Sequence, residues 1–150
     1  MALANEVLRN CHNPDTNRLL VSGNLTVGGV TQKIKSSQDL SVAPLEYITS
    51  ITSDFFFIGV TIAFTDGSNT PVDVDETIKI ILDDTDDNNY DVLLLEENTL
   101  NNEGLPSSSF TFFPDSDIEV FGGSDTNLKI QVTNNNITGI AYMVLYVEVK

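Results

Sequence analysis

The stretch that decides the fold is FFFIGVTIAF, residues 55–64. Apolar residues recur at every second position, and a period of two is typical of a β-strand with one buried face. The turn formers TDGSN at 65–69 predict the end of this strand. Read as a regular strand, the stretch places five side chains on the core face: Phe56, Ile58, Val60, Ile62 and Phe64.

The same period continues along the chain. Ile78, Ile80 and Leu82 alternate with Thr77 and Lys79, which predicts a second half-buried strand. The acidic stretch 83–89 then predicts a hairpin tip, and residues 90–95 predict the returning strand. Further strands are predicted at 44–51, 109–113, 118–121, 128–133 and 140–149. About eight strands without an amphipathic helix predict an all-β protein, an antiparallel jelly-roll-like β-sandwich of two four-stranded sheets.

The last predicted strand, residues 140–149, is apolar on both faces. Such a strand needs cover on both sides, and the core can supply only one. We therefore predict that Tyr142, Val144 and Tyr146 form an interface between copies of the chain. The alternatives that stay open are a central strand covered by a loop of its own chain, or by the N-terminal segment.

Composition narrows the classes of function. The chain has 150 residues, enough for one domain, with 22 acidic and 7 basic residues and a net charge of −15. This balance argues against binding to duplex nucleic acid or to an anionic membrane. One Cys and one His supply neither an internal disulfide nor a Cys/His zinc site. No apolar run approaches the roughly 20 residues of a membrane span, and residues 1–10 lack the pattern of a secretory signal.

The charge divides the chain into two parts. Residues 1–42 carry a net charge of +1, and residues 43–150 carry −16. We interpret 1–42 as an arm ending in a polar linker at 31–41, and 43–150 as the β-sandwich. Within the arm, residues 2–10 predict one or two helical turns that fold only against a partner. Turn formers at 11–17 and an extended segment at 18–21 follow.

The arm resembles a segment that recurs at the N-termini of tailed-bacteriophage virion proteins. In those proteins a short helix precedes a turn and strand of the form (F/H)-x-P-x-T-N-x-L-x-V, which residues 12–21 match. The C-terminal half is similar to phage β-sandwich proteins in its acidic hairpin (83–95), its F-x-F-P-type strand (110–114) and its L-x-I-x-V-T-N strand (128–134). It departs from them at Gly122-Gly123-Ser124-Asp125, where the turn is longer.

The resemblance implies a structural protein of a phage particle: a head decoration (cement) protein, a head fibre or a tail-associated protein. We expect a protein without catalytic activity, made in the host cytoplasm and located in the virion. Its expected partners are the major capsid protein or another virion protein, and further copies of itself, with a trimer favoured. A receptor- or glycan-binding module, using Tyr90 or the loop 96–109, is the alternative. The expected capsid-binding residues are Leu3, Val7, Leu8, Asn10, Pro14, Thr16, Asn17, Arg18, Leu19 and Val21.

Catalytic and metal chemistry find little support. Cys11 and His12 are adjacent, so their side chains diverge in an extended chain, whereas a Cys–His dyad needs them to converge. No third group that would support such a dyad is evident either. Asp84, Asp86 and Asn88 match the opening of a calcium-binding loop, but Asn89 and Leu95 stand where an EF-hand has Gly and Glu. We expect no cofactor, and keep a simple Ca²⁺ site at these three residues as a hypothesis beside that of a solvated hairpin tip.

Overall fold

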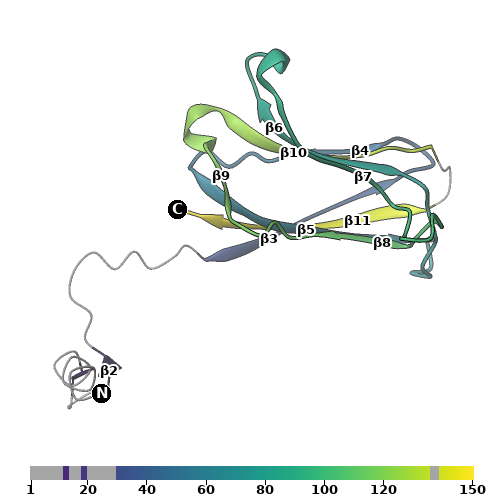
Figure 1. The fold of residues 1–150 in the computed structure, drawn as a ribbon, viewed down its shortest axis with the longest axis horizontal. Helices are drawn as coiled ribbons and strands as arrows, with labels where there is room; N and C mark the ends of the chain where they lie inside the picture. Colours follow the sequence, from purple (N-terminus) through teal and green to yellow (C-terminus); the bar gives the residue numbers. More distant parts are fainter. Residues whose placement is uncertain (1–11, 14–17, 20–29, 136–138) are drawn as a thin grey trace.

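The computed structural model describes residues 12–13, 18–19, 30–135 and 139–150, and most of these form two stacked β-sheets (Figure 1). A short antiparallel pair, β1 (His12–Asn13) and β2 (Arg18–Leu19), precedes the sheets. The strands of the two sheets are β3 (Thr31–Asp39), β4 (Leu45–Ile48), β5 (Phe55–Thr65), β6 (Thr77–Asp84), β7 (Val92–Asn98), β8 (Ser109–Phe112), β9 (Ile118–Val120), β10 (Thr126–Val132) and β11 (Ile140–Val149). Two short 3₁₀ helices, η1 (Asn88–Tyr90) and η2 (Gly122–Ser124), are the only helices in the described part.

The strand order is that of a jelly roll, which confirms the predicted fold. One sheet has the order β4-β10-β6-β7, and the other has β3-β11-β5-β8. β9 pairs with β5 beyond the end of β8, so these two short strands share one position in the sheet. Two sheets of four positions result, and every pair within them is antiparallel. The chain crosses between the sheets after each strand except at the β6–β7 hairpin and between β8 and β9, as in a jelly roll of two Greek keys.

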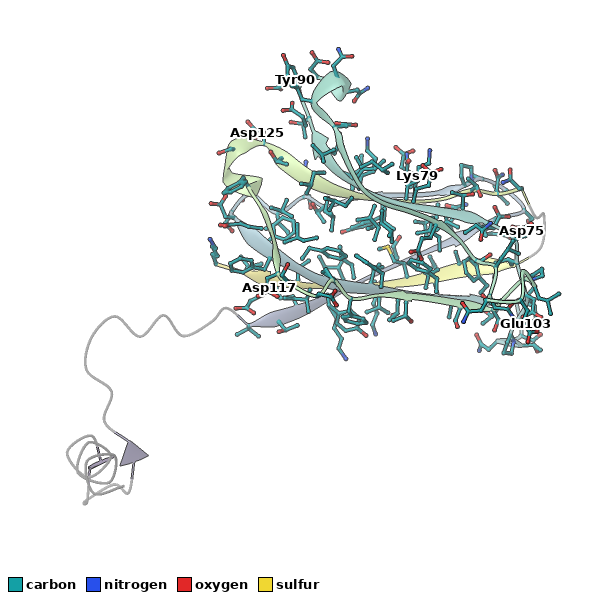
Figure 2. The ribbon with its side chains drawn as sticks, viewed as in Figure 1. Asp75, Lys79, Tyr90, Glu103, Asp117 and Asp125 are labelled. Atoms are coloured by element: carbon teal, nitrogen blue, oxygen red, sulfur yellow. The ribbon has the colours of Figure 1, made fainter. Side chains whose placement is uncertain are left out.

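The core lies between the sheets and is built from both inner faces (Figure 2). Aromatic side chains come from β5, and aliphatic ones from β6, β10 and β11. Burying one such side chain completely stabilises the fold by about 1.5–3 kcal/mol. The largest fully buried side chains are Phe55, Phe57, Phe64, Leu40, Leu45, Ile62, Ile78, Ile80, Leu128, Ile130, Met143 and Leu145.

The face assigned to the first half of β5 was wrong, because the strand contains a β-bulge. Tyr146 pairs with Gly59 and Val147 pairs with Phe57, so Ile58 is the extra residue. An extra residue inverts the alternation on one side of it. Val60, Ile62 and Phe64 are buried as predicted, but Phe55 and Phe57 are the other core residues. Phe56 and Ile58 are only half-buried.

The linker predicted at 31–41 is a strand over most of its length. β3 pairs with β11 along nine residues, from Thr31 opposite Glu148 to Asp39 opposite Ile140. Its sequence is polar because it is an edge strand whose outer side chains are exposed, and charged edges discourage aggregation. Only Ile34 packs against the core from its inner face. The sandwich therefore begins at Thr31, ahead of the boundary at residue 43 that the sequence suggested.

The polar connection between β7 and β8 crosses from one sheet to the other. Thr99 is buried, its hydroxyl donates to the Val74 carbonyl, and the Glu76 N–H donates to that hydroxyl at 2.9 Å. Ser107 donates to the Thr99 carbonyl at 2.6 Å. These bonds fix much of the loop predicted at 96–109 against the end of the sandwich.

Candidate interaction face

The outer face of the five-stranded sheet brings the predicted interface residues together. Strand pairing aligns its side chains in rows across the sheet, and three central rows cross β3, β11, β5 and β8. Each row has one residue from each strand in that order, except that Phe113 follows the end of β8. The rows are Ser37, Tyr142, Ala63 and Ser109; Lys35, Val144, Thr61 and Thr111; and Lys33, Tyr146, Gly59 and Phe113. We call these twelve residues the outer face.

β11 supplies the raised ridge of this face. Tyr142 is 41% exposed, while Val144 and Tyr146 are half-buried. Their neighbours on β5 are small, namely Ala63, Thr61 and Gly59. The face therefore consists of a bulky ridge beside a shallow furrow. A hollow of ≈ 490 Å³ follows the β3–β11 pair and is lined by Lys35, Ser36, Ser37, Tyr142, Met143 and Val144.

Three side chains stack at one end of the ridge. The Phe113 and Tyr146 ring centroids lie 5.7 Å apart, and the Lys33 ammonium lies 5.8 Å from the Tyr146 centroid. Phe113 occupies the space left by the missing side chain of Gly59. Although it lies against the sheet, Phe113 remains 49% exposed. A cation over one ring and a second ring at its edge are favourable contacts that leave apolar surface open to a partner.

The charge of the outer face is opposite to that of the molecule. None of its twelve residues is acidic, whereas the chain carries 22 acidic residues and the flanking rows of the same sheet contain Asp39 at one end and Glu148 and Glu119 at the other. Lys33 and Lys35 have no ion pair with a residue that the structure describes, while Lys79, Lys129 and Lys150 each have at least one. Exposed, unpaired lysines beside aromatic rings favour an approaching negative charge.

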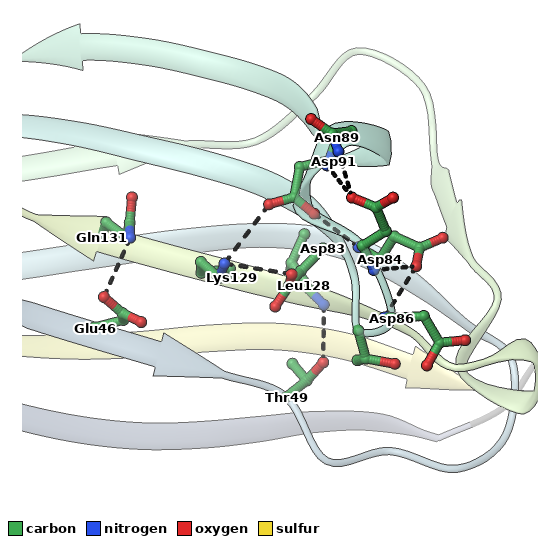
Figure 3. Close-up of polar contacts among 12 residues, drawn as sticks. Glu46, Thr49, Asp83, Asp84, Asp86, Asn89, Asp91, Leu128, Lys129 and Gln131 are labelled. Atoms are coloured by element: carbon green, nitrogen blue, oxygen red, sulfur yellow. Dashed lines mark hydrogen bonds and ion pairs between the residues drawn. The ribbon is translucent and has the colours of Figure 1, made fainter.

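The exposed surface of the four-stranded sheet differs from the outer face, because its charged side chains form ion pairs and hydrogen bonds with one another (Figure 3). Lys129 lies 3.3 Å from a carboxylate oxygen of Asp83 and 3.7 Å from one of Asp91. Gln131 donates to Glu46 at 3.2 Å, and Lys79 lies 3.7 Å from Glu96. This sheet therefore offers a partner few unsatisfied charges on its surface.

The predicted calcium ligands lie on the hairpin between β6 and β7. The Asp84 carboxylate accepts the N–H groups of Asp86 and Asp87 at 3.0 and 3.2 Å, and it thereby stabilises the turn (Figure 3). The Asp87 carboxylate accepts from the Asn89 N–H at 2.9 Å and caps η1, which contains Asn88. Within the described ranges, no group of three or more Asp, Glu, His or Cys side chains is arranged to hold a metal ion. The hairpin carboxylates act in turn formation, and the Ca²⁺ hypothesis gains no support from their arrangement.

The predicted arm lies mainly outside the described residues. This applies to Leu3, Val7, Leu8, Asn10, Pro14, Thr16, Asn17 and Val21, and to the helical turns predicted at 2–10. Arg18 and Leu19 form β2, and their backbones pair with Asn13 and His12. The strand predicted from residue 18 is therefore present at its first two positions. The role of these ten residues in binding a particle stays a prediction.

The remaining candidates are also placed. Tyr90 is 70% exposed at the tip of the β6–β7 hairpin, which projects from the four-stranded sheet and away from the five-stranded sheet (Figure 2). The sequence did not reveal Lys33, Lys35, Phe113 or the small residues of β5 as neighbours of the β11 ridge. Only the pairing of β3 and β5 with β11 shows this, and the polar sequence of β3 concealed it.

No helix in the described ranges is long and apolar enough to cross a membrane.

Comparison with known proteins identifies no family for this chain. No family model matches the sequence, and no curated protein matches it. One similar solved structure is a virus-like particle of the extra small virus of the giant freshwater prawn Macrobrachium rosenbergii, determined by cryo-EM. The two chains are 12% identical, with 85% of this chain and 83% of the other covered, at a TM-score of 0.34. The jelly-roll assignment rests on the strand order of the present chain.

Proposed function

We propose that this chain is a structural protein of a virus particle, without catalytic activity, which decorates a phage head. In this proposal the N-terminal arm binds the major capsid protein or another virion protein, and the β-sandwich associates with further copies. Because β3 begins at Thr31, the arm comprises residues 1–30. The resemblance of residues 4–21 to segments of phage virion proteins supports this role of the arm.

The observation that carries the proposal is the outer face of the five-stranded sheet. Twelve neighbouring residues without a carboxylate include three partly exposed aromatic rings and two lysines that form no ion pair with a described residue, and together they form a surface suited to contact with protein. Jelly rolls are a common architecture of viral capsid proteins, although the fold alone does not define function. Many identical arms on one particle would give tight attachment by multivalency even if each contact were weak.

Removal of residues 1–29 tests the role of the arm. The truncated chain retains all strands of the two sheets, so we expect its thermal unfolding temperature to stay close to that of the full chain. It should no longer sediment with particles that lack the native protein, whereas the full chain should. Leu19→Asp and Val21→Asp in the full chain are a milder version of the same test. If the truncated chain binds particles as well as the full chain does, the arm is not the anchor.

A glycan-binding module is the second candidate, and one observation favours it. Tyr142, Tyr146 and Phe113 present aromatic rings beside the hollow on the β3–β11 pair. Aromatic faces with nearby hydrogen-bonding groups are common in ligand sites. Binding of the full chain to a glycan array, lost in Tyr142→Ala, would support this function. Particle binding without any glycan signal would favour the decoration protein.

A further inference from the structure

We propose that two copies of this chain pack their outer faces together about a two-fold axis that runs parallel to the strands, between β11 and β5. This inference deepens the proposed function, because it assigns the partner of the outer face. It rests on two complementarities of the face, one of size and one of charge. A single symmetry operator satisfies both.

The first complementarity is of size. A two-fold axis between β11 and β5 places β11 of one copy opposite β5 of the other, with residues of the same row facing one another. Tyr142 then lies over Ala63 of the second copy, and Val144 lies over Thr61. The bulky ridge of each copy thus enters the shallow furrow of the other. Two sheets packed face to face need such interdigitation to fill a layer about 10 Å thick.

The second complementarity is of charge. The same axis places the outer edge of β3 opposite the β8–β9 edge of the second copy. β3 carries Lys33 and Lys35, and the segment between β8 and β9 carries the exposed Asp115 and Asp117. Ile118 pairs with Phe57 and Phe112 pairs with Val60, so this acidic segment lies at the level of Gly59, in the row of Lys33. Each interface would contain this lysine–aspartate contact twice.

The size of the face is sufficient for a specific but modest dimer. The whole sheet that carries the outer face, with four strands spaced about 4.8 Å apart and about nine residues long, covers roughly 600 Å² on each copy, and the twelve residues of the outer face form its central half. Both copies together bury roughly 1,200 Å², which is at the lower limit for stable interfaces. The competing self-contact, through the four-stranded sheet, would have to disrupt ion pairs that are already formed within the chain. Within the described part of the chain, Lys33 and Lys35 of the outer face have no ion pairs to lose.

Charge reversal on the full chain tests the arrangement. Light scattering coupled to gel filtration should give the wild type twice the 16.4 kDa mass of the chain at tens of micromolar, falling as salt rises. Lys33→Glu with Lys35→Glu, and separately Asp115→Lys with Asp117→Lys, should each give monomers. An equimolar mixture of these two variants should restore the dimer mass, because every contact then joins opposite charges.

The matched control is Asp73→Lys with Asp75→Lys, a pair of exposed acids with the same spacing, at the opposite end of the sandwich (Figure 2). This variant should remain a dimer although its net charge changes equally. Circular dichroism confirms that each variant folds. A monomeric or trimeric wild type, or a mixture that stays monomeric, would overturn the two-fold arrangement. The arm truncation leaves this experiment unaffected, so failure of particle binding and failure of pairing are separately visible.

Discussion

Phe113 lies where a Cβ atom of residue 59 would stand, with its ring carbons 2.2–2.7 Å from that position. The absence of a side chain at Gly59 therefore leaves the space that the Phe113 ring occupies. Because Phe113 is half exposed, it can swing outward when it is displaced. Gly59→Ala should thus cost little stability, on the order of 1 kcal/mol, while breaking the Phe113–Tyr146 contact. Self-association should weaken with an almost unchanged unfolding temperature.

The double variant Gly59→Ala with Phe113→Ala separates the two effects. It removes the steric conflict, so its stability should be close to that of Phe113→Ala alone. Double-mutant analysis of the unfolding free energies would show this as a coupling of about 1 kcal/mol, equal to the whole cost of Gly59→Ala. Additive effects of the two substitutions would contradict the contact.

Gly122 differs from Gly59, because backbone carbonyl groups and not a movable side chain occupy the space beside it. A Cβ there would lie 2.4 Å from the carbonyl oxygens of both Ile51 and Ser53. Gly122→Ala must shift backbone, and we expect it to destabilise the fold by about 2–3 kcal/mol, measured by urea unfolding. Gly67→Ala is the matched control, since nothing lies within 4 Å of its Cβ position. Equal stability of the two variants would contradict the packing of this turn.

Lys129 and Lys79 allow a comparison of a buried and an exposed ion pair. The Lys129 and Asp83 side chains are 13% and 8% exposed, whereas those of Lys79 and Glu96 are 40% and 49% exposed. Lys129→Met leaves a buried carboxylate without its cation and should cost about 3 kcal/mol. Lys79→Met should cost at most about 0.5 kcal/mol. Chemical unfolding of both variants at the same pH and salt measures the difference.

Glu76 connects three segments at one end of the sandwich. Its carboxylate is fully buried and accepts from the Thr133 hydroxyl at 2.5 Å and from the Asn135 N–H at 2.9 Å. Glu76→Gln introduces an amide that donates as well as accepts, so part of this arrangement is lost. We expect destabilisation of about 1–3 kcal/mol by thermal or urea unfolding. Glu103→Gln, at an exposed position, should leave stability within about 0.5 kcal/mol of the wild type.

Asp66 gives the fold a dependence on acid pH. Its carboxylate accepts from the N–H groups of Thr70 at 2.9 Å and Ser68 at 2.7 Å, and these bonds, Thr70 first, lower the pKa of Asp66 below its ordinary value. A lowered folded-state pKa stabilises the fold above the unfolded pKa of about 3.9, and the effect is lost as pH falls through the folded value. The stability advantage of the wild type over Asp66→Asn should therefore shrink below about pH 4.

The control for this pH series is Gly67→Ala, which alters the same turn but keeps the carboxylate. Its stability difference from the wild type should not follow the acid titration seen for Asp66→Asn. Unfolding measured at several pH values between about 2.5 and 6 covers the window. A wild-type advantage over Asp66→Asn that stays constant through this window would contradict the role of the two N–H donors.

The sequence predicted the jelly roll because alternation along β5, β6, β10 and β11 is strong and the turns are rich in polar residues. It could not predict β3, since an edge strand with exposed lysines lacks the apolar alternation on which such predictions depend. It also missed the bulge at Ile58, because an inserted residue preserves composition while inverting the face of Phe55 and Phe57. The ridge on β11 was predicted from its two apolar faces, but its neighbours depend on pairing over long sequence distances.

β3 also determines how a mechanical load would enter the molecule. Any pull on the residues that precede Thr31 reaches the sandwich through β3, which is bonded to β11 along nine register pairs. Force along the strand axis would shear these backbone bonds collectively, whereas a pull away from the sheet would break them one after another. A protein tethered by its N-terminal segment to a swelling or pressurised shell would thus resist detachment according to the direction of strain.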